Sequence, residues 1–314
     1  MAENTVKKIA TRESYGNSLK ELAEEFPNLV VLDADLAAAT KTGIFRKAYP
    51  DRHIDCGIAE SNMMGVAAGL SLVGKIPFVS SFAMFAAGRA FEQVRNSIGY
   101  PHLNVKIGAT HAGITVGEDG ATHQCNEDIA LMRTIPGMVV MCPSDDVEAR
   151  AAVRAALEYE GPVYIRFGRA AVPVINDHPG YHFEIGKGTV VREGKDVTIV
   201  ATGICVDSAL GAAKMLEEEG ISAEVVNICT IKPLDEEIII NSAKKTGKVV
   251  TVEEHSVIGG LGSAVCDCLC ANHPVPVKKV GMQDVFDESG SAAALVEKYG
   301  LDAKGVYKSV KEFL

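Results

Sequence analysis

The chain has 314 residues, of which 47% are hydrophobic and 23% charged, and this is enough apolar side chain for two globular domains. Its 31 Lys and Arg against 41 Asp and Glu give a formal charge of −10, which argues against a general binder of nucleic acids or membrane surfaces. No apolar run approaches the roughly 18 residues that span a bilayer, and the N-terminus MAENTVKKIATRE lacks the apolar core of a secretory signal, so we expect a soluble, cytoplasmic protein.

Short apolar runs alternate with longer amphipathic segments, which is the pattern of a parallel sheet covered by helices. In the first half the apolar runs predict strands at 29–35, 76–82, 104–110, 138–143 and 163–168. The segments between them predict helices at 11–26, 60–72, 85–99 and 144–160. Ser144, Asp145 and Asp146 have the polar and acidic character of a helix start.

The second half repeats this alternation. It predicts strands at 196–202, 223–228, 248–253 and 276–280, and helices at 206–219, 235–245, 260–271 and 291–298. The stretch between the halves is rich in Pro, Gly and Asn and has no helical period, which is typical of a linker. We therefore predict an α/β protein of two doubly wound, mostly parallel-sheet domains at 1–170 and 189–314, joined by a linker at 171–188.

Eight cysteines in a chain of this length do not make a disulfide framework, and most lie in apolar runs where a thiol packs as a small hydrophobic group. Cys266, Cys268 and Cys270 form a C-x-C-x-C set. On the predicted helix only Cys266 and Cys270 share a face, and zinc sites normally use wider cysteine pairs with further ligands. We expect a reduced helix here rather than a metal site.

The segment DCGIAESNMMGVAAGLSL places one carboxylate, Glu60, at the start of an otherwise nearly uncharged helix. Gly65, Ala68 and Gly69 allow close helix packing, so Glu60 would enter a dry region, where a carboxylate is costly unless it is paired or protonated. An acid at this position is equally explained by the dipole of the helix N-terminus. The segment alone does not decide between a functional and a structural Glu60.

Phe78, Phe82 and Phe85 lie at the end of a predicted strand and the start of the following helix. In open α/β sheets the ends of strands are where ligands bind, and aromatic faces there suit a flat heterocycle. Ordinary core packing explains the same residues, and without other support we favour it.

The longest polar loop is HAGITVGEDGATHQCN, from His111 to Asn126. A loop of about 15 residues without periodicity inside an α/β domain is usually functional, and this one holds two histidines, which are suited to moving protons near neutral pH. Its glycines match neither a phosphate-binding loop nor a dinucleotide fingerprint, and its acids lack calcium-loop spacing. Farther on, the glycine turn in EEHSVIGGLGSAV leads into a helix, which can bind an anion; we favour a purely structural turn.

These segments together resemble the pyrimidine-binding and C-terminal domains of transketolase. The matching pieces run essentially the whole chain and occur in the family's order: DADLAAATKT, GIAESNM, SSFAMFAAGRAFEQVR, THAGITVGEDGATHQ and VYIRFGR. Full-length transketolases carry a further N-terminal domain. The resemblance therefore identifies the chain as similar to the second subunit of a split transketolase, which transfers a two-carbon ketol unit from a ketose phosphate to an aldose phosphate.

The resemblance implies thiamine diphosphate as cofactor, acting as the electron sink of the reaction. Glu60 matches the catalytic glutamate that hydrogen-bonds the aminopyrimidine ring and favours its imino tautomer. Phe82 and Phe85 match the aromatics that pack on that ring, with Phe85 where tyrosine is common. Asp35 matches the aspartate that lines the site near the thiazolium.

The resemblance places the substrate on the long loop and beside it. His111 and His123 match histidines that contact the sugar, and His123 is the better candidate for proton transfer. Asp119 matches the carboxylate that binds a substrate hydroxyl. Arg12 and Arg169 match arginines that hold the sugar phosphate, a task suited to a guanidinium, whereas neighbouring Arg166 should point to the other side of its strand.

One position departs from the family. Ala39 stands where a serine usually helps to bind the substrate phosphate, and the adjacent Thr40 should face differently. This departure puts the standard sugar phosphates in doubt.

The family holds the diphosphate through Mg²⁺ on a G-D-G motif, and no such motif occurs in this chain. The resemblance therefore implies that Mg²⁺ is bound through a separate N-terminal transketolase subunit, that this chain is inactive alone, and that the enzyme is an α2β2 assembly.

Two other functions remain open within the same cofactor superfamily: a 2-oxo-acid dehydrogenase E1 β-type subunit and a deoxyxylulose-phosphate synthase-like fragment. Both share the domain order and a glutamate like Glu60, whereas the paired loop histidines favour transketolase. A non-catalytic regulatory subunit would predict the loss of Glu60 or of the loop histidines, and all are present.

Overall fold

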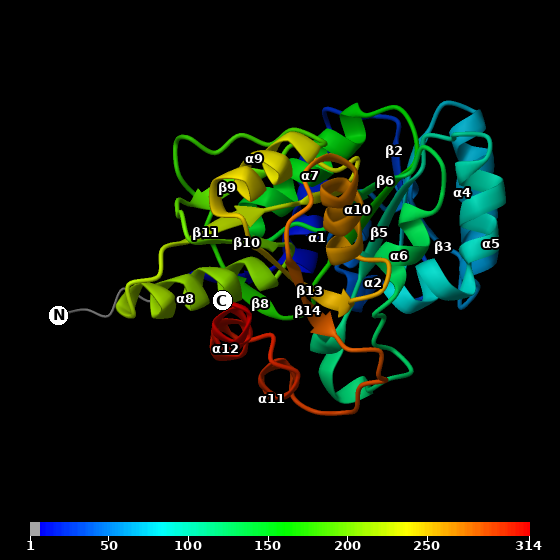
Figure 1. Cartoon of the computed structure of the whole chain (residues 1–314). Helices are drawn as coiled ribbons and strands as arrows, with labels where there is room; N and C mark the ends of the chain where they lie inside the picture. The colour runs from blue at the N-terminus through cyan, green and yellow to red at the C-terminus, as the bar shows by residue number, and fades with distance from the viewer. Residues whose placement is uncertain (1–6) are drawn as a thin grey trace.

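Two large β-sheets and a small one organise residues 7–314, which are the residues that the computed structural model describes (Figure 1). Residues 1–6, on which the prediction of no secretory signal partly rests, lie outside the described residues. Within the described residues no helix is long and apolar enough to cross a membrane.

The first sheet has seven strands in the order β12-β6-β7-β5-β4-β2-β3. All neighbours are parallel except β12, which is antiparallel to β6 and comes from the second half of the chain. The strands are β2 (Leu29–Asp33), β3 (His53–Asp55), β4 (Ile76–Phe82), β5 (Lys106–Thr110), β6 (Val139–Met141), β7 (Val163–Phe167) and β12 (Thr230–Lys232).

The second sheet has five strands in the order β14-β13-β10-β11-β9, with only β9 antiparallel to its neighbour. These strands are β9 (Thr189–Arg192), β10 (Val197–Ala201), β11 (Ala223–Asn227), β13 (Val249–Ser256) and β14 (Val277–Met282). The small sheet pairs β1 (Lys8–Ala10) with β8 (Ala171–Pro173). The start of the predicted linker is therefore a strand, and the domain limits remain a prediction.

Helices connect and cover the strands. In the first half they are α1 (Thr11–Leu22), α2 (Ala37–Thr40), α3 (Gly43–Ala48), α4 (Glu60–Leu72), α5 (Phe91–Gln93), α6 (Asp128–Arg133) and α7 (Asp146–Glu158). In the second half they are α8 (Cys205–Glu218), α9 (Glu236–Thr246), α10 (Leu261–Asn272), α11 (Ala292–Lys298) and α12 (Ala303–Phe313). Four short turns of other helix types are η1 (Pro50–Arg52), η2 (Met84–Arg89), η3 (Val94–Gly99) and η4 (Ile114–Asp119).

The predicted fold class is confirmed. The predicted strands lie at the apolar runs, and the predicted helices lie at the segments between them. The segment predicted as one α-helix at 85–99 differs, because η2 and η3 are π-helical turns on either side of the short α5. Such π-helical turns are frequently found at functional sites.

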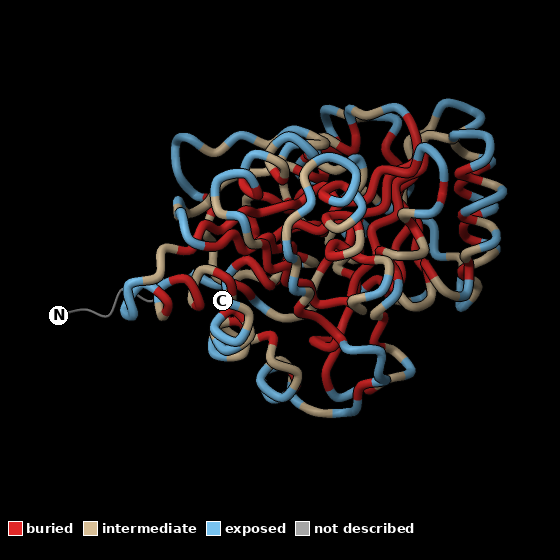
Figure 2. Tube along the Cα trace, in the orientation of Figure 1, coloured by how far each residue is buried: buried red, intermediate tan, exposed pale blue. Residues whose placement is uncertain are grey.

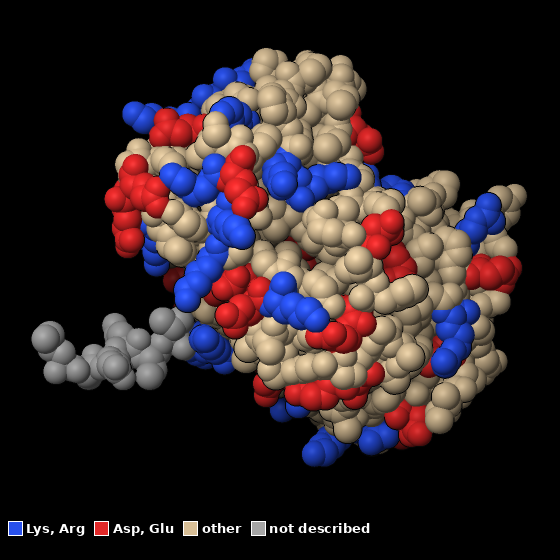
Figure 3. All heavy atoms as spheres, turned by 60° about the horizontal axis from the view of Figure 1, so that its bottom comes forward, with Lys and Arg blue, Asp and Glu red and all other residues tan. Residues whose placement is uncertain are grey.

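The apolar core is continuous between the two halves. Strands such as β2 and β5 are buried along their whole length, because helices cover both faces of a parallel sheet, and Figure 2 shows this burial running through both sheets. One buried apolar cluster contains Tyr164 of the first half and Val200, Val226 and Ile231 of the second. On the surface, Figure 3 shows acidic and basic side chains interspersed over the face viewed.

The glycine turn before α10 is structural, as favoured above. The Glu253 carboxylate accepts the amide hydrogens of Leu261 (2.6 Å) and Gly262 (2.8 Å), so the chain itself satisfies the helix start that an anion would otherwise bind. On the same helix Cys268 is buried while Cys270 is exposed, and all eight cysteines are free. The expectation that Cys266 and Cys270 share a face apart from Cys268 agrees with this burial.

The predicted start of α7 is confirmed, and Asp145 is its N-cap. Its Oδ1 accepts the Glu148 amide (2.9 Å), while its Oδ2 accepts the amides of Ile175 and Asn176, each at 2.7 Å. We expect Asp145→Ala to lower the free energy of unfolding by about 3 kcal/mol, because a cap and two further amide partners are lost together. Urea denaturation measures this.

The matched control is Asp302→Ala at the start of α12, where the carboxylate accepts one amide hydrogen, from Gly305 (2.9 Å). Loss of a single cap costs about 1 kcal/mol. Equal losses in the two variants would show that the bonds from Asp145 to Ile175 and Asn176 add no stability.

Candidate active site

Glu60 begins α4 and is only 2% exposed. Its Oε2 accepts a hydrogen bond from Arg89 Nη1 at 2.9 Å, and Ser81 Oγ lies 3.5 Å from its Oε1. The carboxylate is thus buried and paired, which meets the condition for keeping a charge out of water. Sequence reasoning missed Arg89, although it lies in the same quoted segment as Phe82 and Phe85, because its partner is 29 residues away.

Of the three small residues of α4 expected to pack closely, Gly65, Ala68 and Gly69, only Ala68 does so within the described residues. Ala68 is buried, whereas a Cβ built on Gly65 or Gly69 would meet nothing within 4 Å. The prediction that these two glycines pack closely is therefore wrong within the chain. They lie on an exposed face of the helix that also carries Val66 and continues to Leu72.

The three phenylalanines separate into core and site. Phe78 is fully buried and lies 5.9 Å, ring to ring, from Tyr15 in the core. Phe82, the last residue of β4, stacks on Phe85 with centroids 5.9 Å apart and planes 13° apart. The Arg89 guanidinium lies 4.6 Å above the Phe85 ring, so it contacts both this aromatic pair and Glu60.

His111 follows β5 and stacks on Phe82, with the two ring centroids 3.9 Å apart. Its Nε2 lies 3.1 Å from Arg12 Nη1 and its Nδ1 lies 2.8 Å from Thr110 Oγ1. Burial, with Arg12, Arg169 and Lys41 nearby, lowers the pKa of His111 to about 3. The ring is therefore neutral at pH 7, and it accepts from Arg12 through Nε2 while Nδ1 donates to Thr110.

His123 lies at the edge of the same cluster, half-buried, with its centroid 5.4 Å from Phe85 and 6.3 Å from Phe82. Thr122 Oγ1 is 2.9 Å from its Nδ1, and among residues 7–314 no hydrogen bond engages its Nε2. Of the two loop histidines, His123 is thus the one whose ring nitrogen is available to a bound molecule.

Two arginines extend the cluster from His111. Arg12 Nη1 also donates to the Ala39 carbonyl at 2.8 Å, and burial followed by repulsion from Arg169 lowers the pKa of Arg12. Arg169 donates to the Val116 carbonyl and to Glu118 Oε2 (3.1 Å). A partly buried cationic region results, and such regions attract anions.

Arg166 lies apart from this region, as its position on the strand predicts. Its Nε is 2.9 Å from Asp128 Oδ2, and both side chains are buried. It therefore belongs to the core that joins the two halves.

Asp35 and Asp119 are not joined to the cluster by any hydrogen bond within the described residues. Asp35 is exposed, with φ of 60°, and its amide donates to Asp55 Oδ1 at 3.1 Å. Asp119 is exposed at the end of η4. The buried aspartate of this region is Asp33, whose Oδ2 lies 2.7 Å from His53 Nε2.

Ala39 and Thr40 face as predicted. Ala39 is half-exposed, whereas Thr40 is buried and its hydroxyl donates to the Leu36 carbonyl at 3.0 Å. Thr40 thus does not replace the hydroxyl that is absent at position 39.

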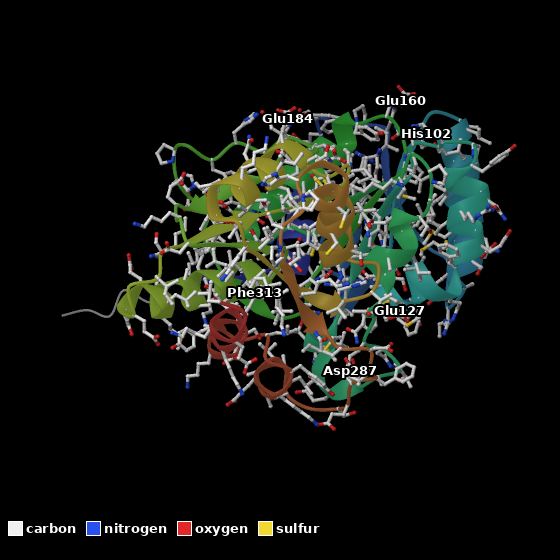
Figure 4. The ribbon with its side chains drawn as sticks, in the orientation of Figure 1. His102, Glu127, Glu160, Glu184, Asp287 and Phe313 are labelled. Carbon is white, nitrogen blue, oxygen red and sulfur yellow. The ribbon has the colours of Figure 1, made fainter. Side chains whose placement is uncertain are left out.

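Contacts run without a break from Glu60 through Arg89, Phe85, Phe82 and His111 to Arg12. A cleft of about 660 Å³ adjoins the Phe85 and Arg89 end of this series, between η2, the 121–127 segment and the 284–287 segment. Glu127 and Asp287, labelled in Figure 4, both line this cleft. Residues 7–314 contain no group of three or more His, Cys, Asp or Glu that could hold a metal ion.

Two family models cover most of the chain. Residues 7–174 match the model described as transketolase, pyrimidine binding domain, and residues 186–306 match the one described as transketolase, C-terminal domain.

Two relatives and one solved structure match this chain over nearly their whole length. A protein of Methanocaldococcus jannaschii, named provisionally as a transketolase C-terminal section, is 52% identical over 303 residues, covering 96% of this chain and 95% of its own. A 6-deoxy-6-sulfo-D-fructose transketolase subunit of Clostridium sp. (strain MSTE9) is 49% identical, with 96% and 93% covered. A solved structure described as a split gene transketolase, inactive beta4 tetramer, is 58% identical, with a TM-score of 0.89 and 98% of each chain covered.

Proposed function

The chain belongs to the transketolase family and corresponds to its pyrimidine-binding and C-terminal domains, and we propose that it is one subunit of a thiamine-diphosphate-dependent transketolase, active only with an N-terminal partner subunit. The enzyme would transfer a two-carbon ketol unit from a ketose phosphate to an aldose phosphate. The observation that carries this proposal is the unbroken series of contacts from buried Glu60 to the cationic region at Arg12.

The residues present fit the cofactor. Only the Ser81 hydroxyl, at 3.5 Å, approaches Glu60 Oε1 within the described residues, so this buried oxygen keeps the capacity to bond a ring nitrogen. Thiamine diphosphate, when bound, supplies an electron sink for breaking the bond beside a ketose carbonyl. Glu60 would hold the proton at the pyrimidine nitrogen, Phe82 and Phe85 would pack against the ring, and Asp35 would line the site.

The other residues would serve the sugar. Arg12 and Arg169 would bind its phosphate, and neutral His111 would orient Arg12 and contact the sugar hydroxyls. His123 would move a proton at the reacting oxygen through its available Nε2. Asp119, which is exposed at the end of η4, would bind a hydroxyl group of the sugar.

Two observations support the need for a partner. The exposed face of α4 with Gly65 and Gly69 continues to Leu72, and Ile58 and Val73, next to the two ends of the helix, are also large exposed apolar side chains. Exposed apolar patches mark contact surfaces. The 58% identical structure is described as an inactive beta4 tetramer. We propose an α2β2 enzyme in which the partner binds Mg²⁺ and the diphosphate, and a cytoplasmic location, which the eight free cysteines support.

The test is co-expression with an N-terminal transketolase section that carries the G-D-G motif. With thiamine diphosphate and Mg²⁺, the purified complex should transfer two carbons from a ketose to an aldose, and neither subunit alone should. Absence of transfer by a stable complex with every sugar tested would contradict the proposal. The panel should contain phosphorylated, sulfonated and free sugars, since one relative is named for a sulfosugar.

We expect Ala39→Ser to lower the KM for phosphorylated sugars about threefold to tenfold. The half-exposed Ala39 adjoins Arg12, and a hydroxyl added there can donate to a charged phosphate, a bond that contributes more than a neutral one. Steady-state kinetics with matched phosphorylated and free sugars measure the effect, and the KM for free sugars should stay constant. An equal change for both kinds of sugar would place position 39 away from the phosphate.

A further inference from the structure

The substrate loop, residues 111–126, is held by both halves of the chain, and the second half contributes hydrogen bonds near its start and near its end. The Thr115 amide donates to Glu254 Oε1 at 2.6 Å. Near the loop's end, Gln124 Nε2 lies 3.2 Å from the Glu288 carbonyl, and Asn126 Nδ2 lies 3.2 Å from Asp287 Oδ2. Figure 1 shows the loop, in teal, projecting from the first sheet beside α11 and the orange segment that follows β14.

The loop glycines fit the same surface. Gly113, Gly117 and Gly120 all have positive φ, and a Cβ on each would approach atoms of the second half. At Gly113 it would overlap the Glu254 carboxyl group, at Gly120 it would overlap the Ser289 hydroxyl, and at Gly117 it would lie 3.3 Å from the Gly290 carbonyl. The loop therefore has glycine at these three positions, where its backbone has positive φ and a side chain would approach atoms of the second half.

Glu254 is the central contact of this surface. It is 4% exposed and lies on β13. Its Oε1 accepts the Thr115 amide hydrogen, and Gly113 packs against its carboxyl group. Arg166 joins the same point to the end of the loop, since its Nη2 donates both to the Glu254 carbonyl (2.8 Å) and to the Cys125 carbonyl (3.2 Å).

We propose that Glu254 is a positioning residue for the substrate loop. Through it the C-terminal half holds the loop, and with it His111 and His123, in one conformation before substrate binds. The effect of Glu254 on catalysis rests on the function proposed above, whereas its effect on the conformation of the loop does not.

The neighbouring residue provides a matched control. Glu253 and Glu254 are both buried on β13, and burial raises the pKa of each to about 7. Their contacts differ: Glu253 caps α10 within the second half, whereas Glu254 binds the loop and its Oε2 lies 3.8 Å from Arg166 Nη1. A general loss of stability would follow from either Glu→Gln change, whereas loosening of the loop should follow only from Glu254→Gln.

The test is hydrogen–deuterium exchange of the full chain at pH 8, where both carboxylates are largely ionised. We expect Glu254→Gln to speed exchange of peptides covering 111–126 about tenfold, because an amide bond to a neutral acceptor is weaker than one to a carboxylate. Glu253→Gln should speed exchange only near residues 261 and 262. Asp287→Ala, a milder variant at the loop's other attachment, should speed loop exchange by a smaller factor and remains informative if Glu254→Gln folds poorly.

In the assembled enzyme, Glu254→Gln should raise the KM for the donor sugar and leave kcat unchanged, because binding must then order the loop. The KM should rise by the same factor by which the fraction of molecules with the loop in the conformation described here falls. Wild-type exchange rates in the loop of Glu254→Gln, or equal loosening by Glu253→Gln, would overturn the proposal. Failure of every complex to transfer two carbons would reject the proposed function and leave the exchange result to decide the role of Glu254.

Discussion

Glu60→Gln should lower kcat for two-carbon transfer by about 10³-fold or more. The amide has the same shape as the carboxyl group, but it cannot exchange a proton with a ring nitrogen, and loss of positioned acid–base chemistry typically costs 10²–10⁴-fold. Burial strengthens the expectation, because no water can take over at a side chain that is 2% exposed. Steady-state kinetics of the assembled enzyme measure the loss.

The control for this change is Glu158→Gln, which removes a carboxylate from the exposed end of α7 and should leave kcat unchanged. Size-exclusion chromatography should show the Glu60→Gln subunit in the same complex as the wild type. If that complex kept near-normal turnover, Glu60 would be a structural helix-start acid paired with Arg89.

His123→Ala should lower kcat about 10²- to 10³-fold while changing the cofactor dissociation constant by less than about threefold. His123 has a ring nitrogen available for proton transfer, and its contacts with Phe82 and Phe85 are edge-on at 5.4 Å or more, so little cofactor contact depends on it. Kinetics together with cofactor titration separate the two effects.

His182→Ala provides the comparison, since this exposed histidine lies in the predicted linker, far along the chain from the loop. It should change neither quantity. Equal losses of kcat and of cofactor affinity in His123→Ala would assign His123 to cofactor binding, and proton transfer would then need another residue.

Local patterns predict the centre of the fold better than its edges. The central strands β2, β4, β5 and β7 are buried apolar runs with turn residues around them, and each lies within its predicted range. Sequence reasoning missed β1, β3, β8, β9 and β12. These strands have three or four residues, too few for a period to appear, and pairing with a strand elsewhere in the chain decides their conformation.

In the site, too, the sequence predicts some features and not others. The resemblance to a family identifies Glu60, the aromatics, the histidines and the arginines as single residues, and the structure brings most of them into contact. The pairings between them are not local: Glu60 meets Arg89 across 29 residues, and Thr115 meets Glu254 across 139. Such contacts depend on tertiary packing and cannot be predicted from the spacing of residues within a motif.

The crossing of β12 into the first sheet has a consequence for synthesis on the ribosome. Until residues 230–232 emerge, β6 is the outer strand of that sheet and its backbone groups on one side have no neighbour. Open strand edges template pairing with other molecules. Nascent chains that stall near residue 190, and fragments truncated there, should therefore aggregate through β6 rather than persist as free pyrimidine-binding domains.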